Sequence, residues 1–223
     1  MKKEVIGRQT LYCGNSLEIM DLLPDKAYGL VLTDPPYMIN TKSDGTGKID
    51  PWGDYMNAAV FYSKWIGQAR EKLTEDGALF SFLNWRSVAT FMRASCLLDW
   101  PMENLLVWNK KHLGTNTYGF RPVYEMIALF RNKGFKVENR ALGDVITFPR
   151  LTRKPNHPAE KPLDLLLFLL ETAGKDNVLD VFMGSGTTLL ACQRLGLSGT
   201  GIEINEKYFD IACQRLQDAV SKQ

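Results

Sequence analysis

The fold of this chain is decided by Val178-Leu179-Asp180-Val181-Phe182-Met183-Gly184-Ser185-Gly186. The stretch begins as a short apolar run, which is typical of a buried strand, and ends in a glycine turn. Leu189 to Leu195 then has the spacing of a helix and stops at Gly196. Gly199 to Ile204 predicts a second strand, so this part of the chain forms one strand–helix–strand unit whose strands lie parallel.

The same alternation extends outward through the rest of the chain. Gly, Pro and Asp residues separate short apolar runs from longer helical patterns. Further strands are expected over 10–13, 28–32, 78–83, 105–108 and 126–130, and helices over 17–23, 58–73, 86–98 and 206–219, with another helix opened by 157–162. Strands that alternate with helices predict a three-layer α/β sandwich with a mostly parallel sheet.

The composition fits a single domain over residues 1–223. Hydrophobic residues make up 45% of the chain, enough for a core that needs no metal or disulfide. The cysteines form no Cys-x-x-Cys pair and no His/Asp cluster has metal-ligand spacing, so we expect no metal. No apolar run approaches the roughly 20 residues of a membrane span. The polar start Met1-Lys2-Lys3-Glu4 is unlike a signal peptide, and a soluble, cytoplasmic protein is expected.

Charge is distributed unevenly along the chain. Residues 105–157 hold ten Lys/Arg against three acids, a local net of +7, whereas the whole chain carries +2. A basic block on an acidic body is typical of a protein that binds a phosphate backbone, although a solvated surface lobe has the same composition. The candidate contacts to the phosphate backbone of a nucleic acid are Lys110, Lys111, Arg121, Arg150, Arg153 and Lys154.

The glycine turn has the features of a cofactor site. Gly184 and Gly186 let a ligand approach the backbone, and the helix after them offers N–H groups at its start. Glu203 ends the next strand, where a carboxylate can accept both hydrogen bonds of a ribose diol. The dinucleotide fingerprint is incomplete at Leu189, and no Gly-Lys-Ser/Thr completes a phosphate loop. An adenosine-type cofactor is expected; the alternative is a turn that only packs a helix.

The sharpest signal for function is the tetrapeptide Asp34-Pro35-Pro36-Tyr37 after an apolar run. Two prolines cannot continue a central strand, so Asp34 leaves the sheet at its carboxyl edge, on a strand expected to neighbour the glycine turn. Asp34 and the Pro35 carbonyl can each accept one hydrogen of an amino group, and Tyr37 can stack on a base. The alternative is an ordinary strand-ending turn. The stretch 38–56 that follows is expected to be a lid-like loop.

With these motifs the sequence resembles the S-adenosylmethionine-dependent amino-group DNA methyltransferases in their circularly permuted, β-type order. There the Asp/Ser/Asn-Pro-Pro-Tyr motif comes first and the cofactor glycine motif last, as Asp34-Pro35-Pro36-Tyr37 and Phe182-x-Gly184-x-Gly186 do here. His157-Pro-x-x-Lys161-Pro162 resembles the segment before that glycine motif, and Leu11 to Leu17 resembles the adenine-contacting segment. The resemblance covers nearly the whole chain and implies a Rossmann-like methyltransferase fold with a seven-stranded sheet.

The resemblance also implies the residues of the site. The implied catalytic residues are Asp34, Pro35, Pro36 and Tyr37. The implied contacts to S-adenosylmethionine are Asn15, Ser16, Asp34, Lys161, Asp180, Phe182, Gly184, Gly186, Thr187 and Glu203. Asn15 stands where the family usually has an acid. We expect the basic region at about 132–156 and the loops at 38–56 and 109–121 to recognise the target.

The implied reaction is methyl transfer to the exocyclic amino group of a base flipped out of double-stranded DNA. Asp34 at the start of the tetrapeptide implies adenine N6, with cytosine N4 as the alternative. Carbon-5 methylation is not expected, since none of the cysteines follows a proline (Cys13, Cys96, Cys192 and Cys213). An RNA or protein methyltransferase and a non-catalytic module of the same fold remain alternatives. The resemblance implies a DNA modification enzyme of restriction–modification type, in bacteria or phage-infected cells, and leaves a homodimer open.

Overall fold

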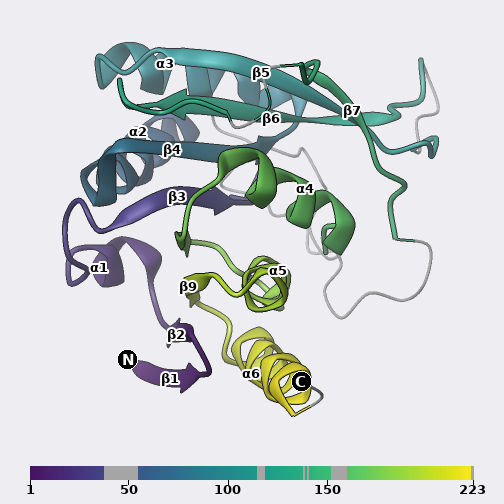
Figure 1. Ribbon diagram of the computed structural model, residues 1–223. Coiled ribbons are helices and arrows are strands. Elements are labelled where there is room, and N and C mark those ends of the chain that lie inside the picture. Colours follow the sequence, from purple (N-terminus) through teal and green to yellow (C-terminus); the bar gives the residue numbers. More distant parts are fainter. Residues whose placement is uncertain (38–54, 115–118, 138, 140, 152–159, 222–223) are drawn as a thin grey trace, which may run out of the picture.

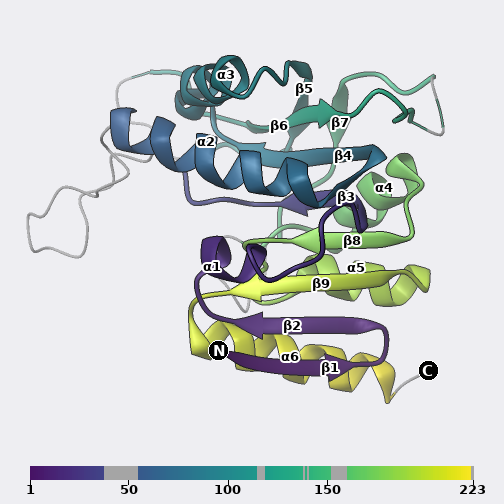
Figure 2. The same cartoon turned by 90° about the vertical axis from the view of Figure 1, so that its left-hand side faces the viewer.

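The computed structural model describes residues 1–37, 55–114, 119–137, 139, 141–151 and 160–221. These residues form one sheet of nine strands with helices on both of its faces (Figures 1 and 2). The strands are β1 (Lys2–Ile6), β2 (Gln9–Cys13), β3 (Tyr28–Thr33), β4 (Leu73–Leu83), β5 (Met102–Asn109), β6 (Tyr124–Arg131), β7 (Val145–Thr147), β8 (Asn177–Asp180) and β9 (Ser198–Glu203).

Parallel pairing dominates the middle of the sheet. The strand order is β1-β2-β9-β8-β3-β4-β6-β5-β7, in which β2, β9, β8, β3 and β4 form a parallel block. Antiparallel pairs flank this block, with β1 beside β2 on one side and β6 between β4 and β5 on the other. The two strands that carry the glycine turn and the tetrapeptide, β8 and β3, are direct neighbours, as their sequence predicts.

Helices cover both faces of the sheet, with α1 (Ser16–Met20), α2 (Tyr55–Lys72) and α3 (Val88–Leu97) on one face and α4 (Leu163–Ala173), α5 (Thr187–Leu195) and α6 (Glu206–Val220) on the other (Figures 1 and 2). On one face Trp65 of α2 and Phe91 of α3 are fully buried in a single apolar cluster. On the other face Leu169 of α4 and Phe209 of α6 anchor two further clusters. None of these helices combines the length and the apolar character that a membrane span needs.

The sheet has two strands more than the seven expected from the sequence. β1 leaves four of its five residues exposed and lies at the edge, so it lacks the apolar alternation that marks a strand. β7 is three residues long with only Ile146 buried, inside a region that was expected to be irregular. The helix expected to include Pro162 in its first turn begins at Leu163 instead, with Pro162 extended at the N-cap.

The connections around β3 and β8 define where a ligand can bind. β3 is followed by α2 on one face of the sheet, whereas β8 is followed by α5 on the other face (Figures 1 and 2). When neighbouring parallel strands send their connections to opposite faces, a crevice opens beyond their carboxyl ends. Asp34 and the glycine turn both begin at this point.

Gly186 is fixed in place by packing, which a matched pair of substitutions can measure. Its φ is +80°, and a Cβ there would lie 2.8 Å from the Cβ of Ala212 on α6. Gly196 has a φ of +70° with nothing within 4 Å, so it reports the conformational strain alone. We expect Gly196→Ala to lower the free energy of unfolding by about 1 kcal/mol. Gly186→Ala should cost about 3 kcal/mol, since no rotamer relieves an overlap of two Cβ atoms.

Urea denaturation of the wild type and both variants measures these free energies. Equal losses for Gly186→Ala and Gly196→Ala would contradict close packing of the glycine turn against α6.

Candidate active site

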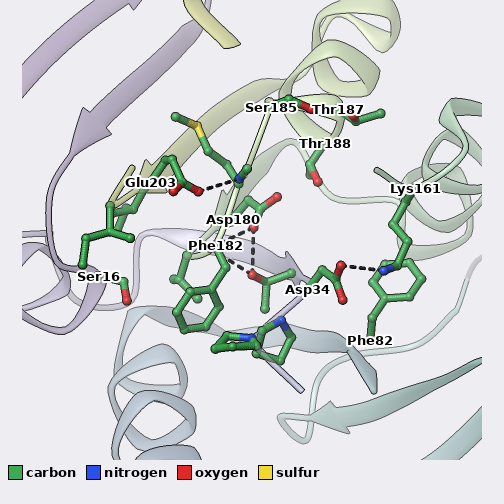
Figure 3. Close-up of a pocket in the computed structure, with 18 of the residues that line it drawn as sticks. Ser16, Asp34, Phe82, Lys161, Asp180, Phe182, Ser185, Thr187, Thr188 and Glu203 are labelled. Carbon is green, nitrogen blue, oxygen red and sulfur yellow. Dashed lines mark hydrogen bonds and ion pairs between the residues drawn. The ribbon is translucent and has the colours of Figure 1, made fainter. Parts of the chain in front are cut away.

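A cavity of about 470 Å³ opens at this crevice. Its walls come from the segments after β2, β3, β8 and β9 and from the residues just before α4. The sequence-predicted residues that line it are Asn15, Ser16, Asp34, Pro35, Pro36, Tyr37, Lys161, Asp180, Phe182, Gly184, Thr187 and Glu203. Figure 3 shows Lys161 and Asp34 at one end of this cavity and Glu203 at the other. The fold thus brings together residues that lie up to 188 positions apart, from Asn15 to Glu203.

Asp34 is the first residue beyond β3, and its two carboxylate oxygens have different surroundings. Oδ2 forms an ion pair with Lys161 Nζ at 2.5 Å (Figure 3). Oδ1 is buried and has no hydrogen-bond partner within the described part of the chain. The turn that holds this carboxylate is pinned by the Tyr62 hydroxyl, which donates to the Pro36 carbonyl at 2.8 Å. One oxygen of Asp34 is therefore an acceptor held in place at the cavity.

Lys161 connects Asp34 to a chain of alternating charges. Its side chain is 8% exposed, and its ammonium also lies 3.3 Å from Glu125 Oε2. Glu125 in turn accepts a hydrogen bond from Lys110 at 3.1 Å and one from the Tyr37 hydroxyl at 3.4 Å. The ammonium of Lys161 also faces the rings of Phe82 and Tyr37, at 4.9 and 5.4 Å from their centroids. Each buried charge thus has a partner of opposite sign.

These contacts shift the protonation equilibria. Burial raises the pKa of Asp34 against the opposing attraction of Lys161. Burial alone would lower the pKa of Lys161, but Asp34 and Glu125 outweigh it and raise that pKa. Burial likewise disfavours the charged form of Glu125, yet Lys161 and Lys110 prevail and hold the pKa of Glu125 below its ordinary value. Lys161 and Glu125 are consequently both charged at neutral pH.

Asp180 ends β8 and links the two central strands. Its Oδ1 accepts hydrogen bonds from the Thr33 hydroxyl at 2.7 Å and from the Phe182 backbone N–H at 3.1 Å. Burial raises the pKa of Asp180 to about 6, with hydrogen bonds from Thr188 and Thr33 opposing the shift. Thr33 was not expected from the sequence as part of the site. Through these bonds the start of the glycine turn is tied to the strand that carries Asp34.

Glu203 ends β9 at the other side of the glycine turn. Its Oε2 accepts a hydrogen bond from the Gly184 backbone N–H at 3.0 Å, and its Oε1 accepts one from Asn205 at 2.7 Å. Each carboxylate oxygen has further lone pairs, so Glu203 can still accept hydrogen bonds from a ligand. Asn15 caps α1 by accepting from the Leu17 N–H at 3.1 Å. It lines the cavity, but its side-chain oxygen is engaged with the backbone.

Arg215 of α6 hydrogen-bonds to three residues that line the cavity. The sequence did not predict this contribution of Arg215 to the site. Its guanidinium donates to Ser185 O at 2.7 Å and to Glu160 Oε1 at 2.6 Å, and it also reaches Thr187 Oγ1 at 3.2 Å. Glu160 lines the cavity, and its side chain is 8% exposed. Its place beside Lys161 in the motif before α4 could have drawn attention to it. Arg215 and Glu125 have no such local signal, because their contacts arise only in the tertiary structure.

Two sequence-predicted residues have a different setting from the one expected. Gly186 does not line the cavity among the described residues, and its lack of a side chain is required by Ala212 of α6. Lys110 was expected to contact DNA, but its side chain is 16% exposed and its ammonium is paired with Glu125. The reason is that Lys110 follows β5 beside the start of β6, where Glu125 faces it. Lys110 thus belongs to the charge chain, and its contact with DNA stays a prediction.

Three of the remaining candidate DNA contacts belong to the described residues, and they lie at the carboxyl edge of the parallel strands. All three are exposed. Lys111 follows the end of β5, Arg121 precedes the start of β6, and Arg150 follows the end of β7, and these strand ends lie at that edge. Arg121 also donates to the carbonyls of Gly114 and Leu113, which braces the turn between β5 and β6. Arg153, Lys154, His157 and most of the 38–56 loop lie outside the described residues, as does part of the 132–156 region.

Comparison with known proteins identifies the family. A family model described as DNA methylase (N6_N4_Mtase) matches residues 28–214. The DNA adenine methyltransferase YhdJ of Escherichia coli (strain K12) is 26% identical, over 95% of this chain and 83% of its own length. The chain therefore belongs to the N6/N4 DNA methylase family, which confirms the resemblance.

Solved structures show the same fold. The M1.HpyAVI–SAM complex has a TM-score of 0.70 at 24% identity, covering 93% of this chain and 99% of that one. The PvuII DNA methyltransferase (cytosine-N4-specific) has a TM-score of 0.76 at 14% identity, covering 99% of this chain and 96% of that one. The expected Rossmann-like methyltransferase fold is confirmed.

The Arg215–Glu160 pair gives a test of how the cavity is held. Arg215→Met keeps much of the side-chain volume but removes the guanidinium that pairs with the buried Glu160 carboxylate. We expect this variant to lose about 3 kcal/mol of unfolding free energy, as for a buried ion pair that loses one partner. Arg194→Met on the neighbouring α5, where the arginine is exposed, serves as control and should be near neutral. Chemical denaturation checks both; equal stability of the two variants would contradict the bracing role.

Proposed function

We propose that this protein transfers a methyl group from S-adenosylmethionine to the exocyclic amino group of a base in double-stranded DNA, with adenine N6 as the target. The observation that carries the proposal is the Asp34 carboxylate, which lies at the cavity with one buried oxygen lacking a partner among the described residues. Membership of the N6/N4 DNA methylase family supports the amino-group chemistry.

The residues of the cavity suit S-adenosylmethionine. A volume of about 470 Å³ falls in the range typical of small-molecule sites. Glu203 would hold the ribose, Phe182 and Ser16 would border the adenine, and Asp180 would face the cationic part of the molecule, since a carboxylate favours a positive charge nearby. The solved M1.HpyAVI structure, which has the same fold, is a SAM complex. When bound, the cofactor supplies a methyl group on a positively charged sulfur.

The residues around Asp34 can activate a poor nucleophile. The lone pair of an aromatic amine is delocalised into its ring, so the nitrogen must become pyramidal before it reacts. Asp34 Oδ1 would accept one N–H of the amine and the Pro35 carbonyl the other, which favours that geometry by positioning and preorganised electrostatics. Asp34 would take up the proton that the methylated amine releases. Tyr37 lines the same end of the cavity, and its ring would pack against a planar base. Phe82 lines this end too, but it is 1% exposed and has the ammonium of Lys161 over its ring.

The proposal names adenine as the target base and double-stranded DNA as the substrate. Asp34 at the head of the tetrapeptide favours adenine, because Ser is more usual there in cytosine N4 enzymes, and the relative YhdJ is a DNA adenine methyltransferase. The exposed residues Lys111, Arg121 and Arg150 lie at the same edge of the sheet as Asp34 and would contact phosphates. The region at about 132–156 would complete target recognition.

Nucleoside mass spectrometry tests the proposed function. Methylation-deficient bacterial DNA is incubated with the protein and S-adenosylmethionine, digested to nucleosides and analysed. N6-methyladenine is the expected product. N4-methylcytosine would keep the chemistry and overturn the adenine assignment, and absence of both products would overturn the proposal.

Substitution of Asp34 separates chemistry from binding. Asp34→Asn keeps the shape and an acceptor oxygen but removes the negative charge that would stabilise the cationic nitrogen and take up its proton. We expect kcat to fall at least about a hundredfold for this reason. The dissociation constant of S-adenosylmethionine, measured by calorimetry, should change little. Asp164→Asn, at an exposed aspartate of α4, is the control and should keep full activity. An Asp34→Asn enzyme that stays active, or one that also loses the cofactor, would contradict the catalytic role.

A further inference from the structure

Glu125 stands outside the cavity but contacts two of the residues that form it. The carboxylate lies on β6, opposite Trp108 of β5, and it is absent from the cavity lining among the described residues. Its Oε2 contacts the ammonium of Lys161 at 3.3 Å and the hydroxyl of Tyr37 at 3.4 Å. Glu125 can therefore act on Asp34 through Lys161 and Tyr37, and its charge also acts on Asp34 directly across space.

The charges near Asp34 balance only if Glu125 is counted. Asp34 and Glu125 are both negative, and Lys161 lies between them with a side chain that is 8% exposed. Lys110 supplies the second positive charge, at 3.1 Å from Glu125 Oε1. The row Asp34, Lys161, Glu125 and Lys110 is thus electrically neutral, and it runs from the cavity to the residue that follows β5.

Neutrality matters because the proposed reaction brings positive charge to this place. The attacking nitrogen becomes cationic as its bond to the methyl group forms, and the bond from that methyl group to sulfur breaks. The nitrogen then passes its proton to Asp34. An excess positive charge beside Asp34 would oppose this step, since charges separated by a few ångströms in a partly buried site interact strongly.

We propose that Glu125 is a positioning residue for Asp34, which holds the Lys161 ammonium on Oδ2 and leaves Oδ1 for the amino group of the base. Without the charge of Glu125, the ammonium of Lys161 has Asp34 as its sole carboxylate partner among these four residues, and the row carries a net charge of +1. The hydroxyl of Tyr37 at the same time faces a neutral acceptor in place of a charged one. This inference rests on the proposed methyl transfer at Asp34.

Glu125→Gln tests the inference because it removes the charge and keeps the shape. With saturating methylation-deficient DNA and S-adenosylmethionine, we expect kcat to fall about 10- to 100-fold, the range that a charge-assisted hydrogen bond is worth. The dissociation constant of S-adenosylmethionine should be unchanged, and Glu125→Asp should recover part of the lost kcat. The matched control is Glu103→Gln on β5, where the carboxylate is 46% exposed and paired with Arg131, and it should retain full kcat.

The pH profile of kcat separates electrostatic positioning from a merely structural role. The groups that face Asp34 are Lys161, Glu125, Tyr37 and Asp180, and the acid limb reports protonation of the two aspartates. Glu125→Gln removes a negative charge, so it should move the acid limb to lower pH. Lys110→Met removes a positive charge from the same row and should move it to higher pH. Opposite shifts from two neighbouring substitutions are not expected of a structural defect.

Several results would overturn the inference. Full kcat in Glu125→Gln would do so, and so would a loss of kcat in which both variants shift the acid limb in the same direction or leave it unmoved. If Glu125→Gln does not fold, the upward shift in Lys110→Met decides the question alone. A wild-type protein that forms no methylated nucleoside would overturn both the proposed function and this inference. An active wild-type protein whose kcat does not change on substitution of Glu125 would overturn the inference alone.

Discussion

The parallel pairing of β3 with β8 is the constraint on which the rest of the site depends. Leu30 lies opposite Val178 and Val31 opposite Leu179, so both strands end at the same level. Asp34 leaves one strand where the glycine turn leaves the other, and the 2.7 Å bond from Thr33 to Asp180 ties the two exits together. A slip of one residue would turn every side chain of the strand to the opposite face. The buried core on both faces forbids it.

The charged side chains of the site are buried among apolar residues. Phe82 packs edge-on against Trp108 at 6.2 Å and also faces the ammonium of Lys161. Burial of a carboxylate or an ammonium is unfavourable unless a partner of opposite sign stands beside it. Lys161 and Glu125 are such partners for each other. Asp34 is paired with Lys161 through its Oδ2 atom. The remaining oxygen is a buried acceptor with no hydrogen-bond partner in the part of the chain that the structure describes.

Local sequence pattern predicts the central strands and helices of this fold, but it misses the two outer strands and the exact start of α4. Tyr28 to Leu32 is a continuous apolar run that is short enough for a buried strand, and β3 runs from Tyr28 to Thr33. The glycine turn marks the start of α5. β1 was missed because an exposed edge strand carries no hydrophobic alternation, and β7 because three residues are too few to show a period. Pro162 was placed inside α4, although its ψ of 133° is that of an N-cap. Sequence pattern leaves such boundaries open by a few residues.

The sequence by itself determined the fold class, the order of the motifs and half of the residues that line the cavity. It could do so because a carboxylate followed by two prolines, and glycines between a strand and a helix, have the same local geometry wherever they occur. Only the tertiary structure decided that Lys110 turns inward to Glu125 and that Arg215 braces Glu160. These are ion pairs between segments that are distant in sequence or joined by a turn, and their partners are chosen by the packing of the sheet and not by any pattern in the chain.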